Sequence, residues 1–139
     1  MSKVYWDTML FIYLLEDNKQ FASRVEDIYD RMQVRGDSLF TSFLTLGEVL
    51  AGVQGLPQKA TEIRENFSAM NVQLVSFEGG AVDTFASLRG VRKLATADSI
   101  HLACAASKGV DLFLTGDRQL TKQNVPGIQF ISSIETSPI

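Results

Sequence analysis

The sequence predicts an α/β protein, a three-layer α/β/α fold around a central parallel sheet of five strands. Two features of the chain predict this class. Short apolar runs alternate with helical patterns along the sequence, which is typical of the strand–helix–strand crossovers that build parallel sheets. The run at residues 110–114 is mostly apolar, as expected for a strand that helices cover on both faces. Because no internal repeat or linker divides the chain, we expect one domain over residues 1–139.

The first third of the chain predicts two strands and two helices. Residues 3–6 are the first expected strand, and residues 9–15 continue directly as a helix. Apolar residues recur at three- and four-residue spacing over residues 21–32, which predicts an amphipathic helix. Gly36 closes this helix, and residues 38–42 form the second expected strand.

The middle of the chain predicts three helices around one strand. Apolar residues at helical spacing over residues 46–53 indicate the next helix, and Pro57 suits the first turn of another. The third strand is expected at residues 72–77. Apolar residues on one face of residues 81–88 then predict a helix that follows a pair of glycines.

The last third predicts one helix and two strands. Residues 96–107 are helical in pattern, and Gly109 is a suitable residue for the end of this helix. The fourth strand is expected at residues 110–114 and the fifth at residues 128–131, after a Pro-Gly pair. We expect residues 135–139 to be loosely ordered.

The composition excludes several classes of protein. Hydrophobic residues make up 45% and charged residues 21% of the chain, which is typical of a folded globule and not of a disordered protein. The longest apolar run, at residues 9–15, is much shorter than the roughly 20 residues of a membrane span. The start of the chain lacks a signal-peptide pattern. We therefore expect a cytoplasmic protein without a membrane segment.

The single cysteine and the single histidine limit the chemistry further. One cysteine forms no disulfide within the chain, and Cys104 in its apolar context is expected to be a buried, inert thiol. One cysteine and one histidine do not suffice for a structural zinc site. The net charge of −3 also argues against a nucleic-acid binder that is basic over its whole surface.

Four carboxylates fall near the ends of the expected strands. Asp7 follows the first strand, Glu48 lies six residues after the second, and Asp117 follows the fourth. Asp98 lies at the start of the helix that leads into the fourth strand. Ligands of open parallel sheets bind beyond the carboxyl ends of the strands. We therefore expect these four side chains to meet at one rim of the sheet.

Each carboxylate also has an ordinary structural interpretation. Asp7 and Asp117 suit helix N-caps, Glu48 suits a capping box with Thr45, and Asp98 suits the positive end of a helix dipole. Four acids at one rim, however, repel one another unless a cation balances their charge. Carboxylates without His or Cys favour Mg²⁺ or Mn²⁺ over zinc. The natural chemistry of such a centre is phosphodiester hydrolysis.

Four segments of the sequence resemble the PIN domain family, and within it the VapC-like toxin ribonucleases. They occur in order over nearly the whole chain: residues 4–12 (VYWDTMLFI), 41–50 (TSFLTLGEVL), 96–105 (TADSIHLACA) and 112–120 (LFLTGDRQL). The third segment is the most specific of the four. Each alone is a weak signal, whereas all four in order with compatible spacing are a strong one.

The resemblance implies a PIN-like fold and an endonuclease that cuts RNA with metal-activated water and leaves a 5′-phosphate. It assigns one or two Mg²⁺ or Mn²⁺ ions to four acids: Asp7, Glu48, Asp98 and Asp117. It also implies that Thr115 and Thr8 orient these carboxylates or a water. One residue departs from the family pattern, since many members have Asn two residues after the first Asp and this chain has Met9. The fine geometry of the metal site is therefore expected to differ.

The resemblance further implies a homodimer and a cognate antitoxin protein that blocks the acidic groove, as in type II toxin–antitoxin pairs. Arg89, Arg92 and Lys93 cluster just before Asp98 and are candidates for contacts with RNA phosphates. An ordinary solvated helix end explains these three residues equally well. We expect His101 to be a packed, hydrogen-bonded histidine outside the site.

Two other functions stay open on the sequence alone. A housekeeping RNA-processing nuclease of the same fold would carry the same acids. A non-catalytic binding module would keep them as helix caps and use its surface for a partner. Binding of Mn²⁺ separates the binding module from the two nucleases.

Overall fold

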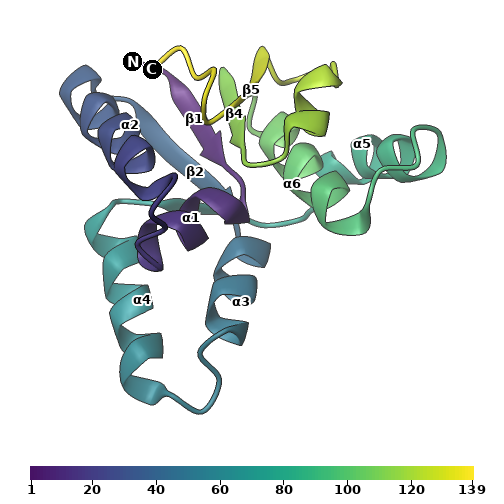
Figure 1. Ribbon diagram of the computed structural model, residues 1–139. Helices are drawn as coiled ribbons and strands as arrows, with labels where there is room; N and C mark the ends of the chain where they lie inside the picture. Colours follow the sequence, from purple (N-terminus) through teal and green to yellow (C-terminus); the bar gives the residue numbers. More distant parts are fainter.

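A parallel sheet of five strands lies at the centre of the computed structural model, which describes residues 1–139 (Figure 1). The strand order is β3-β2-β1-β4-β5, and every neighbouring pair is parallel. The strands are β1 (Lys3–Trp6), β2 (Ser38–Ser42), β3 (Gln73–Val75), β4 (Leu112–Thr115) and β5 (Phe130–Ser133). The predicted fold class is confirmed.

Six α-helices and one short 3-10 helix connect the strands. They are α1 (Thr8–Leu15), α2 (Ala22–Arg35), α3 (Phe43–Ala51), α4 (Pro57–Ala69), α5 (Gly79–Gly90), α6 (Thr96–Ser107) and the 3-10 helix η1 (Arg118–Lys122). The predicted helix at residues 96–107 is confirmed with the same bounds, whereas η1 was not predicted. None of the helices combines the length and the apolar character that crossing a bilayer requires.

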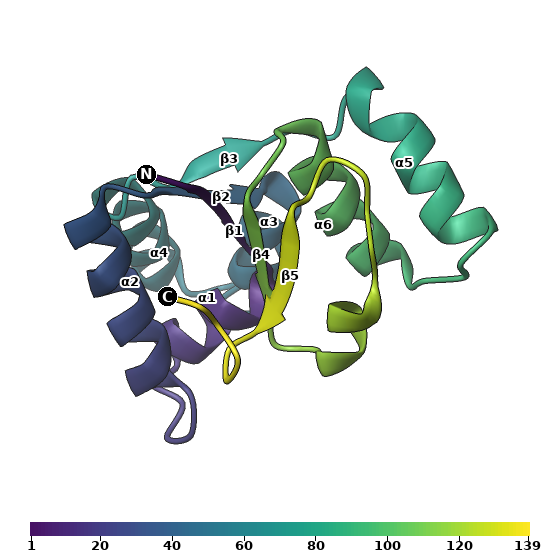
Figure 2. The same ribbon diagram turned by 90° about the horizontal axis from the view of Figure 1, so that it is seen from above.

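Helices cover both faces of the sheet, as the view from above shows (Figure 2). Val4 and Trp6 of β1 belong to one core cluster with residues of α1, α2 and α4, whereas Tyr5 between them belongs to a second cluster with residues of α5 and α6. Successive residues of a strand point to opposite faces. The two clusters therefore fill the two sides of a three-layer fold.

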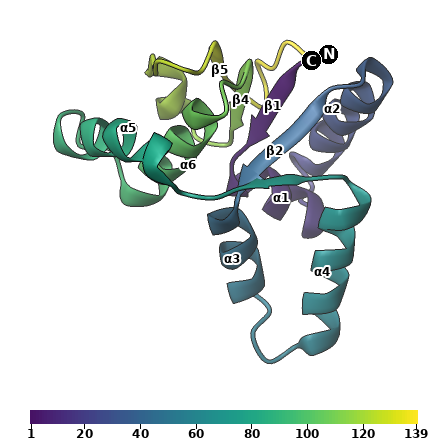
Figure 3. The ribbon, with the colours of Figure 1, turned by 180° about the vertical axis from the view of Figure 1, so that it is seen from behind.

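Helices α3 and α4 extend past the carboxyl end of the sheet as a helical pair (Figures 1 and 3). α3 begins directly after β2 because the Ser42 hydroxyl accepts a hydrogen bond from the Leu44 N–H at 3.1 Å and caps the helix. Pro57 occupies the first turn of α4, as predicted. Since α3 contacts both α1 and α6, its side chains lie beside the segment that follows β1 and the helix that precedes β4.

Three strands differ from their predicted bounds. β5 begins two residues later than the predicted 128–131, β4 begins two residues later than the predicted 110–114, and β3 is shorter than the predicted 72–77. Ile128 is buried, but its N–H bonds to the Val125 carbonyl in a turn before the strand. An apolar side chain in this region therefore indicates burial and not membership of the sheet.

The last residues of the chain pack against α2, and the expectation of a loose tail at residues 135–139 is wrong. Ile139 is 7% exposed and belongs to the first core cluster. The Arg24 guanidinium donates to the main-chain oxygens of Ser137 and Ile139, at 3.4 and 2.8 Å. These contacts join segments more than a hundred residues apart, so the local sequence of the tail carries no sign of them.

Candidate active site

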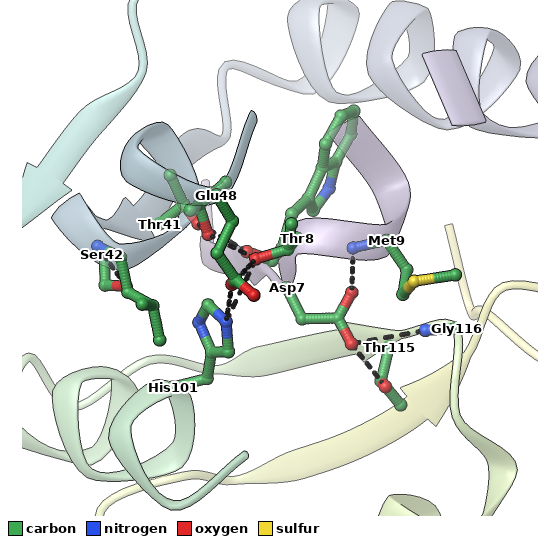
Figure 4. Close-up of polar contacts among 12 residues, drawn as sticks. Asp7, Thr8, Met9, Thr41, Ser42, Glu48, His101, Thr115 and Gly116 are labelled. Atoms are coloured by element: carbon green, nitrogen blue, oxygen red, sulfur yellow. Dashed lines mark hydrogen bonds and ion pairs between the residues drawn. The ribbon is translucent and has the colours of Figure 1, made fainter. Parts of the chain in front are cut away.

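Asp7 lies at the carboxyl end of β1 and caps α1. Its Oδ1 accepts a hydrogen bond from the Met9 N–H at 3.0 Å, which confirms the N-cap interpretation. Its Oδ2 accepts from the Thr115 hydroxyl at 2.6 Å and from the Gly116 N–H at 3.4 Å, both at the end of β4 (Figure 4). Since β1 and β4 are parallel neighbours, the fold itself brings these donors to the carboxylate.

Asp7 is only 6% exposed, and this burial affects whether its carboxylate is charged. The pKa of Asp7 is raised to about 6, mainly because burial disfavours the carboxylate and to a smaller extent because of the charge of Asp98. The three hydrogen bonds oppose this rise in the pKa without cancelling it. Ionised Asp7 is therefore an anion that lacks a compensating cation in its surroundings.

Met9, the residue that departs from the family pattern, packs over the turn that follows β4. A Cβ placed on Gly116 would lie 2.8 Å from the Cβ of Met9, so this close approach requires glycine. Met9 supplies only its backbone N–H to Asp7. In this chain the position therefore contributes packing and a backbone donor, and no polar side chain.

Glu48 lies in the second turn of α3, and its carboxylate faces Thr8 and His101 (Figure 4). Its Oε1 accepts a hydrogen bond from the Thr8 hydroxyl at 2.7 Å and lies 3.6 Å from His101 Nε2. The capping-box interpretation of Glu48 with Thr45 is wrong, because Ser42 caps α3 and the Thr45 hydroxyl contacts the hydroxyls of Thr41 and Thr8. Glu48 is thus directed towards the rim and not towards its own helix start.

His101 lies directly beside Glu48, although we expected it to lie outside the site. The residue is 4% exposed, with Nδ1 2.8 Å from the Tyr5 hydroxyl and Nε2 3.1 Å from the Thr8 hydroxyl. It is the hydrogen-bonded histidine that we predicted, but its partners include a neighbour of Glu48. Burial lowers the pKa of His101 against the opposing effect of Glu48. Its position three residues after Asp98 was the one signal that could have indicated this location.

Asp98 and Asp117 complete the predicted set and are held less firmly. Asp98 is half-buried in the first turn of α6, where Ala95 occupies the N-cap position. Burial raises the pKa of Asp98, and the charges of Asp117 and Glu48 raise it further. Asp117 is exposed and caps η1, since it accepts from the Gln119 N–H at 2.9 Å. The four carboxylates are therefore close enough to affect one another electrostatically.

The chemistry of these donors fits a hard divalent cation. Asp7, Asp98 and Asp117 form no ion pair with any Lys or Arg, and the one basic side chain within ion-pair distance of Glu48 is His101. Oxygen-only donors with excess negative charge suit Mg²⁺ or Mn²⁺. In their present positions, however, no three acidic, His or Cys side chains are close enough together to hold an ion. Binding would therefore require some of these side chains to move.

The basic residues before Asp98 brace the surrounding loops. Arg89 donates to the Leu94 carbonyl at 2.7 Å, and Arg92 donates to the Gln123 side chain and the Asn124 carbonyl at 3.1 and 2.9 Å. Lys93 is exposed and has a left-handed backbone, with φ of 59°. The two arginines thus have structural partners, and Lys93 is the one of the three predicted contacts with RNA whose side chain forms no hydrogen bond or ion pair.

The thiol of Cys104 is buried in the second core cluster, away from any polar partner. Burial raises its pKa to about 11, so the thiol stays protonated and unreactive at neutral pH. The prediction of a buried, inert cysteine is confirmed.

Comparison with known proteins identifies similar sequences and folds. The sequence matches the PIN domain family over residues 4–125. Among curated proteins, none matches this sequence. Three solved structures share the fold: VapBC2 from Rickettsia felis bound to a promoter DNA fragment, DNA-bound VapBC from Salmonella typhimurium, and a toxin–antitoxin complex from Klebsiella pneumoniae.

The likeness to these structures covers nearly the whole of each chain. The Rickettsia structure gives a TM-score of 0.74 at 14% identity, over 94% of this chain and 98% of that one. The Salmonella structure gives 0.72 at 22% identity, over 96% and 99%. The Klebsiella structure gives 0.65 at 18% identity, over 90% and 94%. At such identities the likeness establishes a shared fold.

Proposed function

The chain belongs to the PIN domain family, and on this premise we propose that it is a divalent-metal-dependent endoribonuclease, the toxin of a type II toxin–antitoxin pair. PIN domains are nucleases, so hydrolysis of a nucleic acid follows from membership. The observation that carries the proposal is the group of four acids on four separate elements, none of which has a Lys or Arg partner. Within this group, the charges of Asp117 and Glu48 raise the pKa of Asp98, and the charge of Asp98 helps to raise the pKa of Asp7.

The residues that would hold the ion are Asp7, Glu48, Asp98 and Asp117. A bound Mg²⁺ or Mn²⁺ would neutralise charge at the phosphate and lower the pKa of a water. Hydrolysis of the phosphodiester would join a water oxygen to phosphorus and break the bond to the 3′ oxygen, with a 3′-hydroxyl and a 5′-phosphate as products. Thr115 and Thr8 serve by fixing Asp7 and Glu48 through hydroxyl donors at 2.6 and 2.7 Å.

A cleft beside Glu48 supports the proposal of a protein partner. Helices α1, α3 and α4 enclose about 270 Å³, and five lining residues are apolar. They are Ile12, Leu15, Val49, Val53 and Ile63. Apolar clefts edged by charges are suited to partner helices, and the related structures contain toxin–antitoxin complexes. We therefore include a cognate antitoxin in the proposal, and also a homodimer, which light scattering on the isolated chain would test.

The proposal is tested by incubating purified protein with RNA in Mg²⁺ or Mn²⁺ and identifying the 5′ ends of the products. Cleavage that leaves 5′-phosphates, stops with EDTA and is lost in Asp98→Asn supports it. Asp98→Asn protein that cuts as fast as the parent contradicts it. Growth arrest on expression, relieved by a small protein encoded beside it, would distinguish a toxin from a housekeeping nuclease. Absence of Mn²⁺ binding in calorimetry would favour a non-catalytic binding module.

A further inference from the structure

A buried chain of hydrogen bonds lies directly behind Glu48, and the proposed function gives no role to most of it. Tyr5, His101 and Thr8 form this chain, which ends at the Glu48 carboxylate. Figure 4 shows the part of it that runs from His101 through Thr8 to Glu48. Tyr5 is fully buried, and the other two residues of the chain are less than a tenth exposed. Buried hydroxyl and ring N–H groups need partners, so the position of each proton can be worked out from the contacts.

Two neighbouring threonines fix the first protons. The Thr41 hydroxyl donates to the Trp6 carbonyl at 2.7 Å, so its oxygen can only accept in its contact with Thr45. Thr45 therefore donates its own proton to Thr41, across 2.7 Å. The Thr45 hydroxyl consequently has no proton left for Thr8, although their oxygens are 3.2 Å apart.

The Thr8 hydroxyl donates its single proton to Glu48, at 2.7 Å. Its oxygen can then only accept, and the remaining polar group beside it is His101 Nε2 at 3.1 Å. A hydrogen bond across this distance requires a proton on Nε2. The contacts of Thr8 therefore require that His101 is protonated at Nε2.

The contact on the Tyr5 side agrees with this form of His101. The partner of the Tyr5 hydroxyl in this chain is His101 Nδ1 at 2.8 Å, and burial raises the pKa of Tyr5 so that the phenol keeps its proton. A phenol that donates to Nδ1 requires this nitrogen to be unprotonated. Both sides of the ring therefore select the neutral form with its proton on Nε2.

We propose that His101 is a positioning residue: fixed by Tyr5 in the neutral Nε2–H form, it donates to Thr8, so that the Thr8 hydroxyl donates to Glu48 and holds that carboxylate for the ion. This inference rests on the proposed function, because it concerns the same acids. His101 is not itself a metal ligand, since both of its nitrogens are engaged with Tyr5 and Thr8 in a buried position. Outer groups of this kind orient metal ligands in proteins.

Nuclear magnetic resonance tests the proton positions directly, because His101 is the only histidine in the chain. In protein labelled with ¹⁵N-histidine at neutral pH, we expect one protonated nitrogen, Nε2, and one unprotonated nitrogen, Nδ1. Tyr5→Phe removes the donor to Nδ1 and should shift the Nδ1 resonance, while Nε2 keeps its proton because Thr8 still accepts from it. A proton on Nδ1 in the parent, or an Nδ1 resonance that is unchanged in Tyr5→Phe, would overturn the inference.

Calorimetry with Mn²⁺ tests the positioning role. His101→Leu and Thr8→Val should each weaken Mn²⁺ binding about 10-fold, and Tyr5→Phe should weaken it less. His101→Gln should recover most of the loss, since its amide N–H can reach Thr8 in place of Nε2. Cys104→Ala is the matched control, because it removes a buried side chain of the same helix outside the network, and it should bind Mn²⁺ as the parent does.

The outcomes separate this inference from the proposed function. If Glu48→Gln weakens Mn²⁺ binding but His101→Leu does not, the nuclease proposal stands and the positioning role is wrong. Equal losses in His101→Leu and His101→Gln would also contradict the role, because a donor to Thr8 would then not matter. If the parent itself fails to bind Mn²⁺, both fail together. Should His101→Leu not fold, Tyr5→Phe, which keeps the ring, provides the same comparison.

Discussion

Asp7 and Glu48 are held by buried hydroxyl groups, whereas Asp98 and Asp117 receive little from the rest of the protein. The first two, the held pair, accept hydrogen bonds from threonines that lie on other elements. Of the second two, the open pair, Asp117 accepts from its own turn, and no protein group donates to Asp98. Asp7 directly follows β1 and Glu48 stands at the outer end of a buried network, whereas Asp98 and Asp117 lie at the starts of helices. One side of the rim is therefore organised in advance, and the other is free to adjust to a ligand.

The largest expected effect comes from removing one charge on each side. Asp7→Asn and Asp98→Asn should each lower RNA cleavage at least about 100-fold, because both remove a ligand of the proposed ion. Rates measured with saturating Mn²⁺ on a defined RNA check this prediction. Conversion of Asp83 on α5 to Asn is the control, since this acid takes part in no ion pair or hydrogen bond. If Asp7→Asn or Asp98→Asn kept full activity, the carboxylate that it replaces would have no role in cleavage.

Stability separates the two sides where activity does not. The pKa of Asp7 is raised to about 6 in the folded protein from an ordinary value of 3.8. Between these values the folded state keeps a proton that the unfolded state loses, so the free energy of unfolding falls as the pH rises from about 4 to about 6. Ionisation of Asp7 thus lowers the free energy of unfolding by about 3 kcal/mol, and this loss is complete above pH 6.

Urea unfolding without metal, at pH 4 and at pH 7, measures this loss. Asp7→Asn should unfold less readily than the parent at pH 7 and lose that advantage at pH 4, since asparagine caps α1 equally well and carries no charge. Asp98→Asn should show a smaller dependence on pH because Asp98 is only half-buried. A difference between parent and Asp7→Asn that is the same at both pH values would contradict the assignment of the raised pKa to Asp7.

The sequence predicted the rim because the rim follows from topology. Once residues 3–6 and 112–115 are parallel strands, the acids just beyond them must share one edge of the sheet, and Asp7 and Asp117 could be placed without knowing any side-chain contact. Helix 96–107 was found with its true bounds because it is a long pattern that begins after a basic loop and ends before Gly109. Local sequence patterns are therefore sufficient to predict where the strands and this helix lie, and with them the edge of the sheet at which the acids meet.

The contacts behind the rim were not predictable in the same way. His101 meets Thr8 and Tyr5 across 93 and 96 residues of sequence, and no spacing rule connects positions that far apart. The same holds for Arg24, which binds the end of the chain across 115 residues. The sequence indicated which acids face the edge of the sheet, but which of them would be held in place depends on tertiary contacts that only the structure supplies.

Thr115 connects the two sides, and its removal should have an intermediate effect. Its hydroxyl donates to Asp7 and accepts from the N–H of Asp117 at 2.9 Å. Thr115→Val keeps the shape and loses both bonds, so we expect the protein to be destabilised by about 2 kcal/mol at neutral pH. Thr115→Ser should restore most of this loss. In Thr61→Val, where an exposed hydroxyl bonds only to the Pro57 carbonyl of its own helix, the change should be within about 0.5 kcal/mol. Equal losses of stability in Thr115→Val and Thr61→Val would show that the bond from Thr115 to Asp7 stabilises the protein no more than an exposed hydrogen bond does.

The smallest expected effect concerns Arg92, which braces the segment that follows Asp117. Its guanidinium contacts Gln123 and Asn124 directly after η1, so it steadies the open side from outside the rim. Arg92→Ala should lower the free energy of unfolding by about 1 kcal/mol, because two exposed hydrogen bonds are lost. The alternative role, a contact with RNA phosphate, instead predicts weaker RNA binding and a smaller salt dependence with stability unchanged.

Arg92→Lys distinguishes these two roles, because it keeps the positive charge but loses the planar group that reaches both acceptors. If Arg92 is a brace, the lysine variant should be as unstable as the alanine variant and should bind RNA normally when folded. If it contacts phosphate, the lysine variant should keep most of the RNA affinity, and only alanine should reduce it. Lys93→Ala supplies the comparison, since Lys93 is exposed and forms neither an ion pair nor a side-chain hydrogen bond. If only the Arg92 variants lose stability, Arg92 is a brace, and the loop that it contacts limits how far the neighbouring Asp117 can move.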